Sequence, residues 1–244
     1  MAGLCFQPDC RQEYSRDLPV ETLLSGTRYT FVSDLHLAVS LRSYRSENMA
    51  AFVKALLDFE ESTARDLYAK VSQAYPILMT RNIESAKAWV REQAKGTQRY
   101  GIVASSGAKR LKKYSAWVQS KIDAVQWFLN GNEDVRSSFF LEDTATEFDI
   151  QGLELDWTIV CWDANLRIEL HGLEYYSFSG SRWRNIRKVK NREYLKNSYR
   201  VLLTRARQGF IIFIPYGDNS DETRQKPYYD GIYYYLKRIG IREI

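Results

Sequence analysis

A chain of 244 residues is long enough for one large domain or two small ones. Apolar residues make up 45% and charged residues 27%, a composition typical of a soluble globular protein, and no apolar run is long enough to span a membrane. The net charge of +5 is a modest excess, which indicates an acidic partner only where basic residues cluster.

The amino-terminal residues lack the basic start and the apolar stretch of a signal peptide, so we expect a cytoplasmic protein. The three cysteines, Cys5, Cys10 and Cys161, are too few and too odd in number for a disulfide framework. Cys5 and Cys10 have no second pair of thiols or histidines nearby, and structural zinc requires four ligands. We therefore predict no metal site.

The spacing of apolar residues predicts short strands that alternate with helices. Predicted helices open at Ser46, Ser62 and, as a basic helix, near Ala108, and others cover residues 86–90, 194–207 and 229–236. Predicted strands are the apolar runs at residues 77–79, 100–104, 157–162 and 210–214. Gly209 and Gly240 stand where helices would end. The helical spacing around Trp117 and Trp127 places both side chains in the core.

This alternation predicts an α/β fold, with a mostly parallel sheet and helices on both faces. Residues 1–30 give no strong periodic signal and are expected to form an amino-terminal extension. Residues 31–244 then form one domain, with an insertion at residues 163–193 between a strand and a helix. Ligands of open α/β sheets bind near the carboxyl ends of the strands.

Some sequence segments resemble motifs of known sites but lack residues that those sites require. Residues 33–37 and 131–134 imitate the opening and later motifs of metallophosphoesterases, but the chain has only His36 and His171, and such a two-metal site needs several more histidines. That function is a distant alternative. Residues 105–109 lack the glycine spacing of a phosphate-binding loop, no Gly-x-x-x-x-Gly-Lys-Ser/Thr occurs elsewhere, and no apolar run ends in a Walker-B Asp-Glu pair.

Three segments carry motifs in a fixed order. Residues 37–42 end in Arg42, and residues 144–157 hold Thr146 followed by Gln151-Gly152-Leu153-Glu154. Residues 199–207 contain Thr204-Arg205-Ala206, with an apolar strand directly after them. In this order they resemble motifs IV, V and VI of the second half of superfamily 1 helicases. Over residues 30–240 the chain resembles the carboxyl-terminal part of the Schlafen group 3-like DNA/RNA helicase domain family.

The resemblance implies a RecA-like fold and assigns two catalytic arginines. Arg205 matches the motif VI arginine that reaches the γ-phosphate of ATP held by the other RecA-like half, and Arg42, with Arg45 as the alternate, matches the motif IV arginine. A guanidinium suits this role because it is planar, always charged and able to grip two phosphate oxygens. The alternatives are an ordinary basic helix turn at Arg205 and a solvated arginine at Arg42.

The motif V resemblance implies further contacts. Gln151 and Gly152 match the loop that turns toward the nucleotide, Glu154 matches the carboxylate near its ribose, and Thr146 matches the threonine that touches the nucleic-acid backbone. Phe148 replaces the usual histidine. We expect Arg42, Gln151, Glu154 and Arg205 to converge near the carboxyl ends of the strands. A plain surface turn is the alternative reading of residues 151–154.

Basic residues gather at 109–113 and, more densely, at 182–200. Arginines beside an aromatic residue suit single-stranded nucleic acid, because cations track phosphates and rings stack on bases. The predicted nucleic-acid-binding residues are Arg182, Trp183, Arg184 and Lys188. A solvated positive face is the bland alternative.

The sequence therefore predicts the second RecA-like half of a superfamily 1 helicase-type ATPase. ATP and Mg²⁺ would bind only jointly with a Walker-containing RecA-like partner half, and neither would bind to this chain alone. Single-stranded nucleic acid is the second expected partner, and no membrane is involved. The alternative function is a non-enzymatic module that binds nucleic acid or protein. A split subunit, a truncated product and a remnant of a longer helicase all fit the sequence.

Overall fold

The computed structural model describes residues 4–6, 29–31, 41–169 and 172–244, with side chains for residues 47–169 and 172–244. The chain divides into two compact units, Met1–Glu47 and Asn48–Ile244. In the first unit, β1 (Leu4–Phe6) pairs in parallel with β2 (Tyr29–Phe31). Helix α2 (Leu41–Leu57) begins in the first unit and ends in the second, and its start precedes the predicted one at Ser46.

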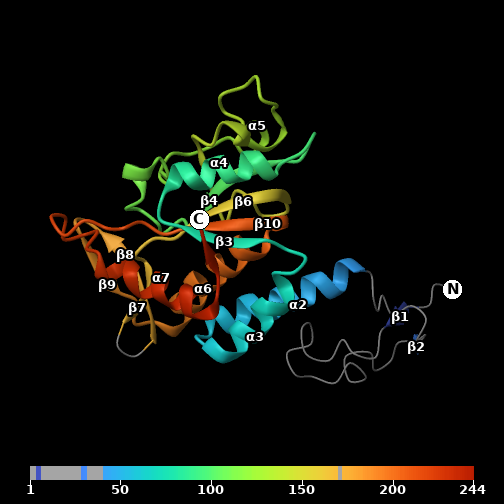
Figure 1. Ribbon diagram of the computed structural model, residues 1–244, viewed down its shortest axis with the longest axis horizontal. Helices are drawn as coiled ribbons and strands as arrows, with labels where there is room; N and C mark the ends of the chain where they lie inside the picture. Colours follow the sequence, from blue (N-terminus) through green and yellow to red (C-terminus); the bar gives the residue numbers. More distant parts are fainter. Residues whose placement is uncertain (1–3, 7–28, 32–40, 170–171) are drawn as a thin grey trace. The chain divides into compact units, whose positions relative to one another are not determined.

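The second unit is built on a six-stranded sheet in which all neighbouring strands run parallel (Figure 1). The strand order across the sheet is β11 (Arg242–Glu243), β3 (Ile77–Thr80), β10 (Ala206–Phe213), β6 (Leu155–Cys161), β4 (Tyr100–Ala104) and β5 (Thr144–Thr146). The four predicted strands are therefore confirmed, and together they form the centre of the sheet. Their near-continuous apolar sequences suit strands that are buried on both faces.

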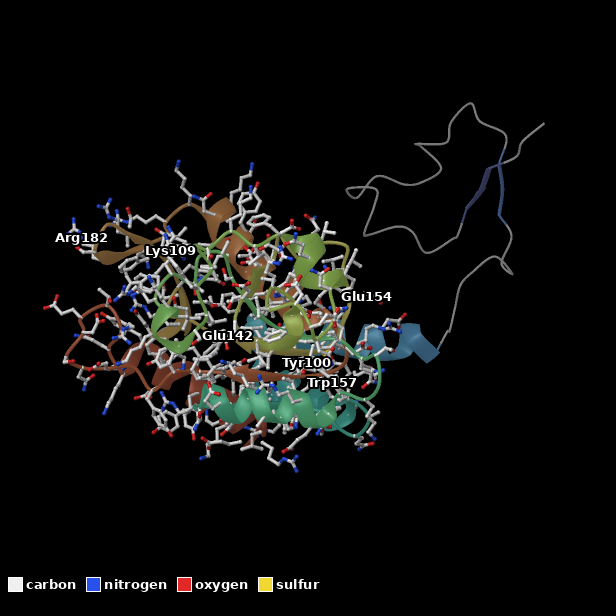
Figure 2. The ribbon with its side chains drawn as sticks, turned by 90° about the horizontal axis from the view of Figure 1, so that it is seen from above. Tyr100, Lys109, Glu142, Glu154, Trp157 and Arg182 are labelled. Carbon is white, nitrogen blue, oxygen red and sulfur yellow. The ribbon has the colours of Figure 1, made fainter. Side chains whose placement is uncertain are left out.

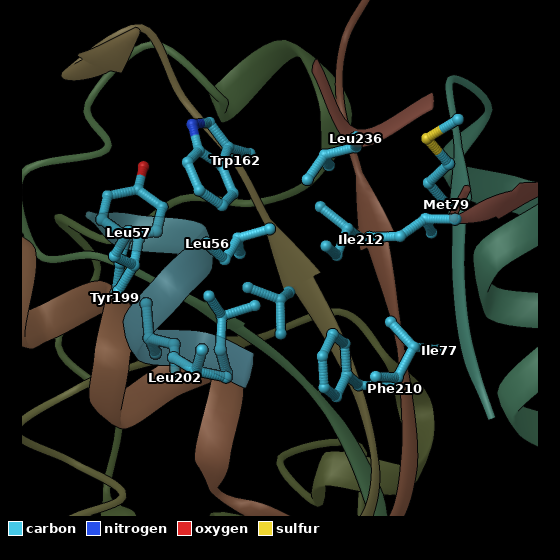
Figure 3. Packing of buried hydrophobic residues seen from close by; sticks show 14 of the residues in the cluster. Leu56, Leu57, Ile77, Met79, Trp162, Tyr199, Leu202, Phe210, Ile212 and Leu236 are labelled. Atoms are coloured by element: carbon cyan, nitrogen blue, oxygen red, sulfur yellow. The ribbon is translucent and has the colours of Figure 1, made fainter. Parts of the chain in front are cut away.

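Alternate residues of each strand enter different cores, because successive side chains point to opposite faces. Ile77, Phe210 and Ile212 pack with α2 and with helices α6 (Val189–Thr204) and α7 (Pro227–Ile239), as Figure 3 shows for part of this core. Ile211 and Phe213 point the other way, toward α4 (Ile83–Gln93). The sheet is thus covered by helices on both faces, which is the predicted α/β, RecA-like arrangement.

Local sequence signals explain where several helices begin and end. Asn82 caps α4 by accepting hydrogen bonds from the amides of Glu84 and Ser85. Proline at the start of α7 fits a helix amino terminus, and Gly240 ends that helix in the left-handed conformation, with φ of 100°. The remaining α-helices of the described chain are α3 (Glu61–Val71) and α5 (Ala124–Leu129). None of the described helices is both long and apolar enough to cross a bilayer.

The segment that follows β6 and precedes α6 in the sequence forms an antiparallel sheet, within the range predicted as an insertion. Its strands are β7 (Leu166–Glu169), β8 (Gly172–Ser179) and β9 (Arg182–Asn185). Helix α7 packs against β7 so closely that a Cβ on Gly231 would lie 2.8 Å from the carbonyl oxygen of Ile168. This contact ties the antiparallel sheet to the helical layer.

Three local predictions are wrong. No α-helix starts near Ala108, because the segment folds as turns with only a 3₁₀ turn at Lys112–Tyr114, which ends where Ser115 turns left-handed at φ 61°. Trp127 is buried as predicted, but Trp117 is 41% exposed and stacks under the Lys112 ammonium. Gly209 lies inside β10 rather than at a helix end, because α6 already stops at Thr204.

Candidate nucleotide and nucleic-acid site

The loops after β4 and β5 form one polar clamp. These strands are neighbours, with Ala104 in register with Thr146, so the residues that follow them meet at the carboxyl edge of the sheet. The carboxylate of Glu147 accepts hydrogen bonds from the Ser106 amide at 2.7 Å and from its hydroxyl at 2.8 Å. Sequence reasoning missed Ser106 and Glu147. Their signal was the placement of polar residues directly after two apolar strands.

The turn that follows β5 holds the predicted motif V residues. Both the amide and the hydroxyl of Thr146 donate to the Asp149 carboxylate, at 2.8 and 2.6 Å, which closes the turn. The Thr146 hydroxyl is thus engaged within the protein. Phe148 is 69% exposed, and Gly152 adopts a φ of 84°, a conformation that favours glycine.

A pocket of about 710 Å³ lies between this turn, one face of α6 and strand β8. Its volume is in the range of small-molecule sites, and its wall is largely aromatic and aliphatic. The predicted residues Gln151 and Arg205 both line it, so the structure brings these two together. The pocket is also lined by Ser106, Lys109, Glu147, Phe148, Tyr176, Phe178 and Tyr194.

Arg205 is the residue at which α6 ends, and it is half-buried. Its Nε is buried without a hydrogen-bond partner, and no ion pair of its guanidinium occurs among the described residues. Arg207, two residues on, is different. It is half exposed, and its Nε lies 3.6 Å from a carboxylate oxygen of Glu154. The two neighbouring arginines therefore have different surroundings, one facing a pocket and one in a surface ion pair.

The edge of the sheet at which these residues lie differs from the prediction. Glu154 and Arg205 directly precede β6 and β10, whose first residues Leu155 and Ala206 are in register. Both therefore lie at the amino ends of the strands, not at the carboxyl ends. Ligands of α/β sheets bind beside residues that follow strands. Arg205 instead precedes a strand, because α6 runs back across the sheet and ends at the opposite edge. Figure 2 shows Glu154 far from Lys109 and Arg182.

A buried polar network at the carboxyl end of β6 was not anticipated. The Asp163 carboxylate accepts from the Arg110 amide at 2.9 Å, the Ala164 amide at 2.8 Å and the Tyr229 hydroxyl at 3.0 Å. Burial raises the pKa of Asp163, and these hydrogen bonds partly oppose that rise. Tyr199 of α6 joins the network by donating to Asn165 at 2.7 Å. It fixes α6 and α7 against the end of β6.

The predicted nucleic-acid residues lie on β9 and at the start of α6. Arg182, Arg184 and Lys188 are exposed. Trp183 points to the other face of β9, since residues alternate along a strand. Its ring packs against Phe178 with centroids 5.1 Å apart, and its indole N–H donates to the Thr223 carbonyl at 2.8 Å. Along β9, Trp183 therefore lies on the face opposite to the two arginines that flank it in sequence, although Arg182 and Trp183 both border one pocket beside the loop before α7.

Arg42 lies in the first turn of α2, within the unit Met1–Glu47. Its side chain lies outside the described side chains, so its predicted phosphate contact stays a prediction. The histidines and the cysteine pair noted in the sequence also fall outside the described side chains.

Comparisons with known proteins support the helicase resemblance. A family model, described as the Schlafen group 3 DNA/RNA helicase domain, matches residues 9–216, which is more than half of the chain. Searches of curated proteins and of solved structures gave no match. The match covers the sheet strands β3 to β10, the turn after β5 and the end of α6 at Arg205. The chain therefore belongs to the Schlafen group 3 DNA/RNA helicase domain family.

Proposed function

We propose that this chain acts as the second RecA-like half of a superfamily 1 helicase-type ATPase and supplies Arg205 to ATP bound by a Walker-containing half. The observation that carries the proposal is the state of Arg205. A buried guanidinium N–H without a partner is costly, and such groups gather at functional sites. A phosphate brought to this edge by a second half would satisfy it, and arginine binds phosphate oxygens in its rigid fork.

The surrounding residues are consistent with a nucleotide-facing edge. Gln151 shares the pocket of Arg205, while Gly152 and Glu154 continue the same turn to the amino end of β6. In this proposal Glu154 approaches the ribose, and Arg42 keeps the role that the motif IV resemblance implies for it, an arginine that contacts phosphate. The Walker-containing half would bind Mg²⁺ and the β- and γ-phosphates, since this sequence has no phosphate-binding loop.

Nucleic acid would bind at the opposite end, on the exposed cations Arg182, Arg184 and Lys188. Thr146 would join only by exchanging its bond to Asp149 for one to the strand. Binding to phosphates through exposed cations is weak in sequence preference and steep in salt dependence. A module that binds nucleic acid without any role in ATP hydrolysis would share these residues, and the following experiment separates the two functions.

The test pairs the chain with the Walker-containing half, whether encoded on the same polypeptide or beside it, and measures phosphate release. The chain alone should not hydrolyse ATP, and the pair should. Arg205→Ala should lower the stimulated rate by a factor on the order of 10³–10⁵, as for other arginine fingers. Arg207→Ala is the matched control, because its exposed ion pair is worth about 0–1 kcal/mol.

Three results would contradict the proposal. Equal losses in the two variants would indicate a general positive field rather than a finger at Arg205. A stimulated rate that survives Arg205→Ala would remove the arginine from catalysis altogether. Absence of any stimulation by the wild-type chain, with retained binding of single strands, would leave the non-enzymatic binding module as the function.

A further inference from the structure

Arg167 of β7 is a buried cation held between two aromatic rings. The residue as a whole is only 4% exposed. The guanidinium carbon lies 3.5 Å from the ring centroid of Tyr176 of β8 and 4.0 Å from that of Tyr228 of α7. Stacked rings stabilise the cation from above and below. They do not satisfy its hydrogen-bond donors, which point outward in the guanidinium plane.

Those in-plane donors are poorly matched by protein acceptors. Arg167 Nε and Nη1 are buried without a hydrogen-bond partner. The single ion pair found for Arg167 among the described residues joins its Nε to Glu169 Oε1 at 3.3 Å, and the Glu169 side chain is 45% exposed. The same Glu169 oxygen accepts a hydrogen bond from the Tyr176 hydroxyl at 2.7 Å. A buried guanidinium normally has its donors satisfied, so this site lacks an acceptor.

Arg167 lines a pocket of about 290 Å³ between β7, β9 and the loop before α7. Arg182 of β9 lines the same pocket, and so do the hydroxyl- and amide-bearing residues Ser181, Thr223 and Gln225. Trp183 and Tyr228 form aromatic walls of this pocket. Glu222 is the one carboxylate among the described residues that line it. Two arginines with neutral donors around them fit a tetrahedral oxyanion.

We propose that this pocket binds a backbone phosphate of single-stranded nucleic acid, with Arg167 and Arg182 as its two cationic ligands. The inference rests on the proposed function, and it names the anchor of the nucleic-acid surface. A strand fits better than free phosphate because the pocket is larger than one phosphate and has aromatic walls against which a sugar or base can pack. Arg184, on the same face of β9 as Arg182, continues the positive track.

The carboxylate of Glu222 allows a separate test of whether an anion binds in this pocket. This exposed carboxylate borders the pocket and repels an incoming phosphate. In this account Glu222→Gln should strengthen binding of a single strand. A pocket that has no anion in it would respond to this substitution weakly or not at all.

The experiment measures the binding of short single-stranded DNA and RNA by fluorescence anisotropy over a range of salt concentrations. Arg182→Ala should weaken binding about tenfold or more, the loss typical of a charge-assisted contact. Arg184→Ala is the matched control, an exposed arginine two positions along β9 that does not line the pocket. It should weaken binding less than about fivefold. Arg182→Ala should also lower the salt slope by about 0.7, the value for one contact with a single strand.

Arg167→Lys is the second variant, which keeps the charge but loses the guanidinium fork. It should weaken binding while its melting temperature shows a folded protein. Inorganic phosphate and ATP are tested as competitors. If they displace the strand from the wild type at millimolar level but not from Arg182→Ala, the pocket is confirmed as a phosphate site.

Equal losses in Arg182→Ala and Arg184→Ala would overturn the pocket, because they indicate a diffuse positive face. Binding of inorganic phosphate that depends on Arg182, with strand binding that does not, would overturn the strand as the ligand. Both results leave the ATPase role of Arg205 untouched, since that role is measured by phosphate release in the paired halves.

Discussion

Replacing Tyr199 by phenylalanine removes a single oxygen atom from the buried network at the carboxyl end of β6. That hydroxyl donates to Asn165 Oδ1 at 2.7 Å and accepts from the Asp163 amide at 3.3 Å, and the residue is fully buried. The substitution leaves both groups without these bonds. Each unsatisfied buried group costs about 1–3 kcal/mol, so we expect a loss of at least about 2 kcal/mol in the free energy of unfolding.

Tyr229→Phe is the matched substitution, with a smaller expected effect. The Tyr229 hydroxyl donates to Asp163 Oδ1, which keeps a bond from the Ala164 amide when the hydroxyl is removed. No group is orphaned, and we expect a loss of about 1 kcal/mol.

In a domain of this size, about 1 kcal/mol lowers the melting temperature by roughly 2–4 °C. Calorimetry should therefore show Tyr199→Phe about 4–8 °C below the wild type and Tyr229→Phe less than half as far. Equal shifts, or a larger shift for Tyr229→Phe, would refute the claim that the Tyr199 hydroxyl satisfies two buried groups that have no substitute partner.

Two further predictions concern stability. Gly209→Ala should lower the melting temperature, because its Cβ would lie 2.6 Å from the Pro76 carbonyl oxygen and 2.7 Å from the Trp157 ring, whereas the exposed neighbour Gln208→Ala should leave it unchanged; overpacking of this kind costs about 1–3 kcal/mol. Burial raises the pKa of Asp58, but hydrogen bonds from Lys196 and Lys54 outweigh it and hold the pKa below its ordinary value of 3.8. A lowered pKa in the folded state stabilises the protein above the ordinary pKa, and this contribution is lost as pH falls through the lowered value. The difference in melting temperature between the wild type and Asp58→Asn should therefore be largest near neutral pH and shrink below about pH 4; a constant difference across this range would contradict the assignment.

The sheet could be predicted from the sequence because its central strands are uniformly apolar. The run at residues 210–214 and the run at 157–162 became neighbouring strands, with Ile211 in register with Ile159. The final helix was equally clear, since Tyr229 and Leu236 share one face and Gly240 ends it. These elements depend on local periodicity, which a sequence displays directly.

The segment after β4 could not be predicted because long-range bonds decide its shape. A basic run near Ala108 favours a helix by propensity, but the Arg110 amide donates to Asp163, which lies after another strand. Ser115 then takes a left-handed conformation that ends the 3₁₀ turn. Tertiary contacts of this kind override local preference.

The candidate site was predicted in part. Gln151 and Arg205 meet at one pocket, as the motif order indicates. The predicted edge of the sheet was wrong for Glu154 and Arg205. A residue lies at the amino end of a strand if it precedes the strand and at the carboxyl end if it follows it, and both residues precede theirs. Arg167 could not be found, since its two stacking tyrosines come from β8 and α7, and only the fold brings them together.

Capture of a transition-state analogue tests the central claim most directly, because it isolates the contact between Arg205 and the transferring phosphate. The paired halves are incubated with ADP and aluminium fluoride, and the retained ADP is measured beside retention of ADP alone. Transition-state analogues bind far more tightly than ground-state ligands where catalytic contacts are present. The wild type and Arg207→Ala should trap the analogue, while Arg205→Ala should bind ADP normally and fail to trap it. Trapping by Arg205→Ala as tight as that by the wild type would contradict the account.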